Sequence, residues 1–256
     1  MKVQDAFKKG KAFIAFLTCG DPDIETTEKL IAEMEKDGVD LIELGIPFSD
    51  PTAEGPVIQG ANIRALSKGI TTDKIFDMVK RVRKTVKIPL VFMTYANVVF
   101  SYGTERFVKN SAEAGINGLI LPDVPFEEKE EFAETCEKSG LDFISLIAPT
   151  SENRIATIAK EAKGFIYCVS SLGVTGVRTS ITSDISGMVS IVRSVTDLPV
   201  AVGFGISTPE QAADMAAKSD GIIIGSAIVK IIAQYGGKSV EPVGEYVRSI
   251  KAAIGK

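Results

Sequence analysis

The chain has 256 residues, of which 45% are hydrophobic and 24% are charged, and its formal net charge is −4. This composition is typical of a globular protein with a sizeable core, and the negative charge argues against a nucleic-acid-binding surface. The sequence contains no histidine, which excludes histidine-based catalytic triads, histidine metal sites and histidine acid–base chemistry.

Short apolar segments recur along the whole chain and predict the strands. Each has four to six residues, is rich in Val, Ile, Leu and Phe, and lacks polar alternation, which is typical of parallel strands covered on both faces. These segments are residues 13–17, 39–44, 89–93, 118–121, 143–147, 165–169, 199–203 and 221–224.

Amphipathic segments of helical length lie between the predicted strands. They are residues 24–36, 72–83, 126–139, 152–162, 185–195 and 209–218, and further helices are expected at residues 61–68 and near both termini. Eight alternations predict a single (β/α)8 TIM barrel with extra helices, which also matches the chain length. We therefore expect one domain over residues 1–256. A doubly wound open sheet is the alternative.

The cysteines and the N-terminal segment indicate the cellular compartment in which the protein is expected. Cys19, Cys136 and Cys168 are odd in number and have no CxxC spacing, so neither a disulfide framework nor a zinc site is expected. Free thiols suit the reducing cytoplasm. The N-terminal apolar run is too short for a signal peptide or a membrane-spanning helix. We expect a cytoplasmic protein without membrane or nucleic-acid partners.

Glycine-rich loops follow the last two predicted strands. GFGIS covers residues 203–207, and GSAIVKII, residues 225–232, opens a helix. Glycine lets backbone N–H groups approach an anion, a helix N-terminus favours negative charge, and these two loops form the usual phosphate site of TIM barrels. Gly173 and Gly176 are expected to add a third wall to this phosphate site. They belong to the long loop 170–184, whose composition predicts a mobile lid.

Glu43 ends a predicted strand and has Ile42 and Leu44 as neighbours. An apolar setting raises the pKa of a carboxyl group, which suits proton transfer near neutrality. Asp21 and Asp123 also follow strands, but each precedes a proline or a helix start, so we expect turn or N-cap roles. No lysine lies at the active end of a strand, which argues against a Schiff-base aldolase. Cofactor-free acid–base chemistry on a phosphorylated small molecule remains.

Six segments carry a resemblance to a known family. They are IELGIPFSDPTAEGPVIQ (42–59), MTYANVVF (93–100), LPDVPFEE (121–128), GVTG (173–176), VGFGIS (202–207) and IIGSAIVK (223–230). In this order they closely resemble the tryptophan synthase α subunit family. The resemblance runs from about residue 13 to residue 230, which is nearly the whole chain. LGIPFSDP is highly specific, whereas GFGIS and GSA also fit many phosphate-binding barrels.

The resemblance implies a lyase that splits indole-3-glycerol phosphate into indole and glyceraldehyde 3-phosphate by a retro-aldol reaction, without a cofactor or metal. The first catalytic acid of the family falls on Glu43. It would protonate C3 of the indole ring and help to deprotonate the glycerol hydroxyl as the C–C bond breaks. The second acid falls on Glu54, which would hold the indole N–H and stabilise the cationic indolenine. Tyr167 matches a tyrosine near the reacting side chain, and Thr175 matches the threonine of the closing lid.

The same resemblance implies a set of substrate-binding residues. The phosphate would be held, mostly through backbone N–H groups, by Gly176, Gly205, Gly225 and Ser226. The residues suited to lining the indole and phosphate pocket are Phe16, Met93, Ile120 and Phe204. Tyr95, at the end of a predicted strand, and Thr175 are also assigned to substrate binding.

The partner implied by the resemblance is a PLP-dependent β subunit that takes the indole through a tunnel, in an α2β2 heterotetramer. PLP would belong to that partner, and this chain would need no cofactor. Loop 46–56 and the lid at 170–184 would lie where the α subunit meets β. Asp50 in this loop is therefore interpreted as a loop and interface group.

The sequence departs from the family pattern at two positions. Thr52 stands where the family usually has Leu, and Glu54 stands where it has Asp. An extra methylene moves a carboxylate by about 1 Å, an error that costs about 100-fold in rate unless the loop shifts to compensate.

Three other functions stay open at this point. One is another phosphate-binding barrel enzyme, such as an indole-glycerol-phosphate synthase or a sugar-phosphate isomerase. A second is a weakly active subunit that acts mainly as an activator of β. The third is a stand-alone lyase that releases free indole.

Overall fold

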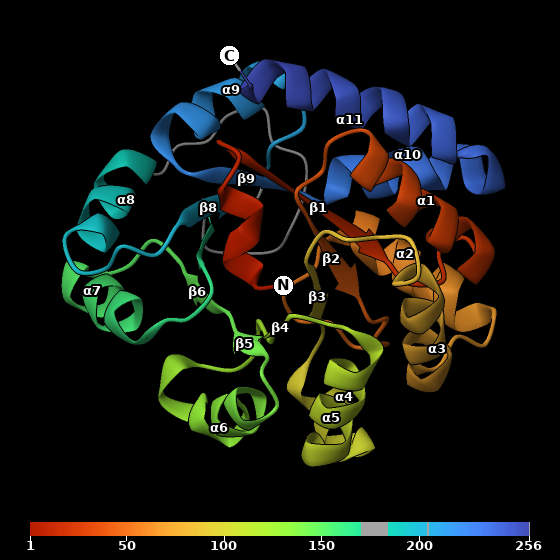
Figure 1. Ribbon diagram of the computed structural model, residues 1–256, viewed down its shortest axis with the longest axis horizontal. Helices are drawn as coiled ribbons and strands as arrows, with labels where there is room; N and C mark the ends of the chain where they lie inside the picture. Colours follow the sequence, from red (N-terminus) through yellow and green to blue (C-terminus); the bar gives the residue numbers. More distant parts are fainter. Residues whose placement is uncertain (170–183, 204, 256) are drawn as a thin grey trace.

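The computed structural model describes residues 1–169, 184–203 and 205–255. Figure 1 shows strands at the centre of the molecule and helices around them. The strands are β1 (Ala12–Thr18), β2 (Leu41–Gly45), β3 (Leu90–Met93), β4 (Gly118–Ile120), β5 (Asp142–Phe143), β6 (Ser145–Ile147), β7 (Ile166–Val169), β8 (Val200–Gly203) and β9 (Gly221–Ile224). Their order in the sheet is β5-β4-β3-β2-β1-β9-β8-β7-β6, and each pair is parallel.

The two ends of this sheet are halves of one extended segment. Gly118 of β4 pairs with Asp142 of β5, Ser145 of β6 pairs with Ile166 of β7, and only Ile144 separates the halves. The backbone N–H of Ile144 donates to the carbonyl oxygen of Leu119 at 2.9 Å. The segment therefore changes partner midway and closes the sheet into a barrel. This confirms the predicted barrel, and the open-sheet alternative is wrong.

The helices are α1 (Ile24–Lys36), α2 (Pro56–Ser67), α3 (Thr72–Val82), α4 (Ala96–Tyr102), α5 (Thr104–Ala114), α6 (Glu130–Lys138), α7 (Glu152–Glu161), α8 (Ile185–Arg193), α9 (Pro209–Lys218), α10 (Ser226–Tyr235) and α11 (Val240–Ile254), with short 3-10 turns η1 (Val3–Phe7), η2 (Phe126–Glu128) and η3 (Gly236–Lys238). No helix in the described part of the chain is long and apolar enough to cross a membrane.

Three helices, α2, α4 and α5, differ from the sequence prediction. The helix expected at 61–68 begins at Pro56, because proline suits the first helical turn and Gly55 precedes it in an extended conformation. Helices α4 and α5 were not predicted. Gly103, with φ of +91°, separates them and leaves two short helices in place of one long amphipathic pattern.

The apolar residues form two layers. The outer cluster lies between strands and helices and includes Phe13, Ala15 and Leu17 of β1. The inner cluster fills the barrel and includes Ile14 and Phe16 of the same strand. This alternation explains why the strands are apolar on both faces. At the amino-terminal end of the strands, η1 packs against the barrel with Val3 fully buried and Ala6 5% exposed.

Candidate active site

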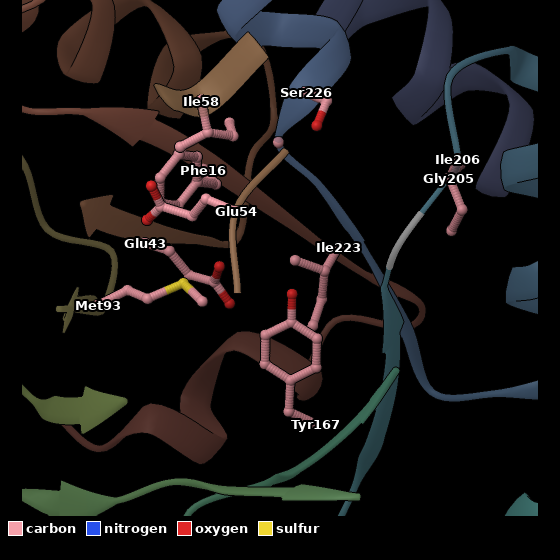
Figure 2. Close-up of a pocket in the computed structure, with 11 residues that line it drawn as sticks. Phe16, Glu43, Glu54, Ile58, Met93, Tyr167, Gly205, Ile206, Ile223 and Ser226 are labelled. Carbon is pink, nitrogen blue, oxygen red and sulfur yellow. The ribbon is translucent and has the colours of Figure 1, made fainter. Parts of the chain in front are cut away.

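A cavity opens at the carboxyl-terminal end of the strands, the end where barrel loops build active sites (Figure 2). Sheet register brings two of its residues side by side, because Phe16 of β1 pairs with Glu43 of β2. The described residues that line the cavity are Phe16, Glu43, Glu54, Ile58, Met93, Tyr167, Gly205, Ile206, Ile223, Gly225 and Ser226.

Glu43 is directed into the barrel by strand alternation. Ile42 and Leu44, its neighbours in β2, belong to the outer cluster, so the side chain between them faces the interior. Glu43 is 1% exposed, and neither carboxylate oxygen has a hydrogen-bond partner among the described residues. Burial raises the pKa of Glu43 to about 8, the direction expected from its apolar neighbours. The group is therefore mostly protonated at neutral pH.

Tyr167 of β7 faces the same space as Glu43, as Figure 2 shows. Its pKa is raised well above the ordinary tyrosine value, first by burial and second by the charge of Glu43, so the hydroxyl and the carboxyl group are neighbours. Gly203 of β8 makes room for the ring, because a Cβ atom at that position would lie 2.8 Å from Tyr167 Cε2. The sheet therefore brings one acid and one phenol from opposite sides of the barrel to one point.

Glu54 lies at the end of the loop between β2 and α2, and α2 holds it. Asn62 Nδ2 donates to Glu54 Oε2 at 2.6 Å, and Gln59 Nε2 donates to the backbone carbonyl oxygen of Glu54 at 2.7 Å. Burial raises the pKa of Glu54 to about 7, and the bond from Asn62 opposes part of this rise. In Figure 2 the Glu54 carboxylate points away from Tyr167. The longer acid is thus folded toward α2.

The opposite side of the cavity consists of glycines and a helix N-terminus. Gly205 has φ of +89°, a conformation that favours glycine. Gly225 precedes α10, and Ser226 is the first residue of that helix. A Cβ atom at Gly225 would lie 3.2 Å from Phe16 Cβ, so glycine is needed for close packing there. The first N–H groups of a helix have no partner within the helix, so this end is suited to bind an anion.

Several predicted residues lie elsewhere. Thr175, Gly176 and Phe204, together with most of the loop 170–184, are outside the described residues. Ile120 belongs to the inner cluster but is not one of the described residues that line the cavity. Tyr95 is likewise not a lining residue, and its hydroxyl accepts a hydrogen bond from the backbone N–H of Ala53 at 3.1 Å.

The two other strand-end acids have different partners. Both carboxylate oxygens of Asp123 accept from the N–H of Ala96, the first residue of α4, at 3.1 Å, which is a capping role. Asp21 instead receives two hydrogen bonds from Arg64 of α2, each 2.8 Å long. The pair holds α2 against the loop that follows β1.

Sequence reasoning missed four residues of this region. Ile58, Ile206 and Ile223 form apolar wall, and Asn62 holds Glu54. Ile223 is part of a predicted strand and Ile206 follows one, so their positions in the sequence already indicated that both lie near the end of a strand. Ile58 lies in the first turn of α2, which the prediction started too late, whereas Asn62 lies inside the predicted helix, where a single asparagine carries no signal for a site.

The cavity combines three features. The cavity has apolar walls, two carboxyl groups with pKa values raised to about 8 and about 7, and, opposite them, a helix N-terminus suited to bind an anion. Among residues 1–169, 184–203 and 205–255, no group of three or more acidic or cysteine side chains is placed to hold a metal ion. Such a site suits general acid–base chemistry on a phosphorylated substrate with an apolar ring.

Comparisons with known proteins agree with one another. The sequence profile of the family described as "Tryptophan synthase alpha chain" matches residues 3–254. The tryptophan synthase alpha chain of Geotalea uraniireducens (strain Rf4) is 50% identical over 246 residues, which are 95% of this chain and 92% of that relative. The one from Lacticaseibacillus casei is 46% identical over 253 residues, covering 99% and 95%. A chain in a structure of the tryptophan synthase a2b2 complex from Pyrococcus furiosus is 32% identical, with a TM-score of 0.87 and coverage of 95% and 98%.

Proposed function

The chain belongs to the tryptophan synthase alpha chain family, and we propose that it cleaves indole-3-glycerol phosphate to indole and glyceraldehyde 3-phosphate in tryptophan biosynthesis. The observation that carries this function is the state of Glu43. It is a buried carboxyl group without a hydrogen-bond partner among the described residues, and its pKa is raised to about 8. A group in that state can donate a proton near neutral pH and accept one back.

Glu43 acts first as the acid. It donates its proton to C3 of the indole ring, which converts the ring into a cationic indolenine and weakens the bond from C3 to the glycerol chain. The resulting carboxylate then takes the proton of the adjacent glycerol hydroxyl. The C–C bond breaks, its electron pair returns to the indole ring, and the hydroxyl carbon becomes the aldehyde. Glu43 ends the cycle protonated, as it began.

Glu54 stabilises the intermediate. As a carboxylate it accepts a hydrogen bond from the indole N–H and offsets the positive charge that the ring gains on protonation at C3. Its pKa of about 7 leaves it partly ionised at neutrality, and the hydrogen bond from Asn62 favours the ionised form. Tyr167 lies beside Glu43 and is proposed to orient the reacting side chain.

The substrate spans the cavity from the acids to the glycines. The indole ring contacts the apolar walls made by Phe16, Ile58, Met93 and Ile223. The phosphate binds at the other end, to backbone N–H groups of Gly205, Gly225 and Ser226 at the start of α10. Thr175, Gly176 and Phe204 are proposed to complete this site.

The partner of the chain is the tryptophan synthase β subunit, in an α2β2 assembly like the complex known from Pyrococcus furiosus. The proposed chemistry uses only carboxyl groups and a phenol, so we propose that this chain needs no cofactor and that PLP belongs to β. The buried free thiols of Cys19, Cys136 and Cys168 support a reducing compartment, and we propose the cytoplasm. We further propose that residues 1–256 form one domain.

The test is indole release from indole-3-glycerol phosphate, measured alone and with a β subunit. We expect Glu43→Gln to abolish release in both cases while a substrate analogue without the glycerol hydroxyls still binds. Glu245→Gln, at an exposed position on α11, is the matched control and should behave as wild type. Cleavage by Glu43→Gln at a rate near wild type would disprove the assignment. No release by the wild type in either case would mean that the chain only activates β.

A further inference from the structure

Tyr95 lies against the loop that carries the second acid. It follows β3, is 2% exposed, and its hydroxyl accepts the backbone N–H of Ala53 at 3.1 Å. The ring of Phe48, in the same loop, packs on the Tyr95 ring with centroids 5.3 Å apart. One tyrosine thus contacts the loop near its start through its ring, and just before Glu54 through its hydroxyl.

The contact with Ala53 matters because of where Ala53 sits. Its neighbour Glu54 is held on the other side by α2, where Asn62 binds the carboxylate and Gln59 binds the backbone carbonyl. Residues 46–55 contain neither helix nor strand, so their path depends on such side-chain contacts. The charge of Glu54 also raises the pKa of Tyr95, after the larger effect of burial, which shows that the two side chains are close. Tyr95 itself is not one of the described residues that line the cavity.

We propose that Tyr95 is a positioning residue for the second acid: its hydroxyl holds the Ala53 N–H and so sets where the Glu54 carboxylate lies. The inference rests on the proposed role of Glu54. It replaces direct substrate binding by Tyr95 with an action through the loop. This hydrogen bond suits a chain in which the second acid is one methylene longer than the aspartate usual in the family. The longer side chain has more rotamers, so the position of its backbone must be fixed for the carboxylate to be placed.

Tyr95→Phe isolates the hydroxyl, since it keeps the ring contact with Phe48. Displacement of a catalytic group by about 1 Å costs about 100-fold in rate, so we expect kcat to fall by about 10- to 100-fold. The Kd of the substrate analogue without glycerol hydroxyls should stay within about twofold, because the walls and the phosphate end are untouched. The matched control is Tyr102→Phe, which removes a hydroxyl bonded to Asp73 and Asn110 outside the cavity and should leave kcat unchanged.

A double variant tests whether Tyr95 acts through Glu54. Glu54→Gln alone should be slow, and adding Tyr95→Phe should slow it no further, because the acid that the hydroxyl positions is already absent. If the decreases in kcat of the two single variants multiply in the double variant, Tyr95 acts independently of Glu54 and the inference is wrong. A Tyr95→Phe enzyme as fast as wild type, beside a slow Glu54→Gln enzyme, overturns the inference but leaves the proposed function intact. A fast Glu54→Gln enzyme overturns the proposed role of Glu54 and this inference with it, but leaves cleavage through Glu43 intact.

Amide hydrogen exchange provides a second measurement that does not depend on turnover. Peptides covering residues 49–55 should exchange faster in Tyr95→Phe than in the wild type, because the Ala53 N–H loses its partner. The same peptides should be unchanged in Tyr102→Phe. Equal protection in all three proteins would show that the hydroxyl does not hold the loop, and would overturn the inference even if Tyr95→Phe were slow.

Discussion

Replacing Glu43 with glutamine should make the enzyme inactive and, at high pH, more stable. The carboxyl group is 1% exposed and has no hydrogen-bond partner among the described residues, so ionisation inside the barrel is strongly unfavourable. Glutamine has nearly the same size and never ionises. The variant therefore removes the cost of a buried charge while it leaves the packing of β2 and the cavity walls in place.

The magnitude follows from the raised pKa. Burial raises the pKa of Glu43 from its ordinary value of 4.5 to about 8. Between these values the folded protein holds a proton that the unfolded chain has released, so wild-type stability falls by about 1.4 kcal/mol per pH unit. The stabilising contribution of protonated Glu43 to the free energy of unfolding is fully present below the pKa that this group has in the unfolded chain. It is lost as the pH rises through the pKa that the group has in the folded protein. The stability of Glu43→Gln relative to wild type should therefore rise by about 4 kcal/mol from pH 5 to pH 9.

The assay is urea unfolding of both proteins at a series of pH values. The chain has no tryptophan and five tyrosines, so tyrosine fluorescence and far-UV circular dichroism are the two probes, and their transitions should coincide. Any constant penalty from burying the amide cancels in the pH dependence, and Glu54 titrates in both proteins. Glu245→Gln controls for the loss of an exposed carboxylate. If the stability difference between Glu43→Gln and wild type stays constant within about 1 kcal/mol across this range, the reasoning is refuted.

Two other outcomes follow from the same contacts. The pH profile of kcat should be bell-shaped with its maximum between about pH 7 and pH 8, because Glu54 must be ionised and Glu43 protonated. The variant Glu54→Gln should lose the fall in kcat on the acid side. If that fall is unchanged in the variant, it belongs to another group. Arg64→Met should lower the free energy of unfolding by about 3 kcal/mol, because it leaves the buried Asp21 carboxylate without its two hydrogen bonds. The control Arg81→Met removes an exposed pair with Glu28 and should lower the free energy of unfolding by less than about 1 kcal/mol. Equal losses of the two variants in urea unfolding would contradict this difference.

Much of the architecture was predictable from local signals. Apolar runs without polar alternation located the strands, and Glu43 was found because it ends such a run. The glycine loops at 203–207 and 225–232 were found for the same reason, since they follow strands directly. The start of α2 and both α4 and α5 escaped prediction, because Gly60 and Gly103 interrupt the patterns that mark longer helices.

The amino-acid sequence by itself determined the barrel class, the family and which acids stand near the cavity, because these depend on hydrophobic period and on residues close together in the chain. The tertiary structure alone decided how the acids are held. Glu54 meets Asn62 across 8 residues, Ala53 meets Tyr95 across 42, and Asp21 meets Arg64 across 43. The partner change at Ile144 that closes the barrel is of the same kind. Such contacts depend on loop paths and side-chain rotamers, which local sequence does not encode and only the closed barrel fixes.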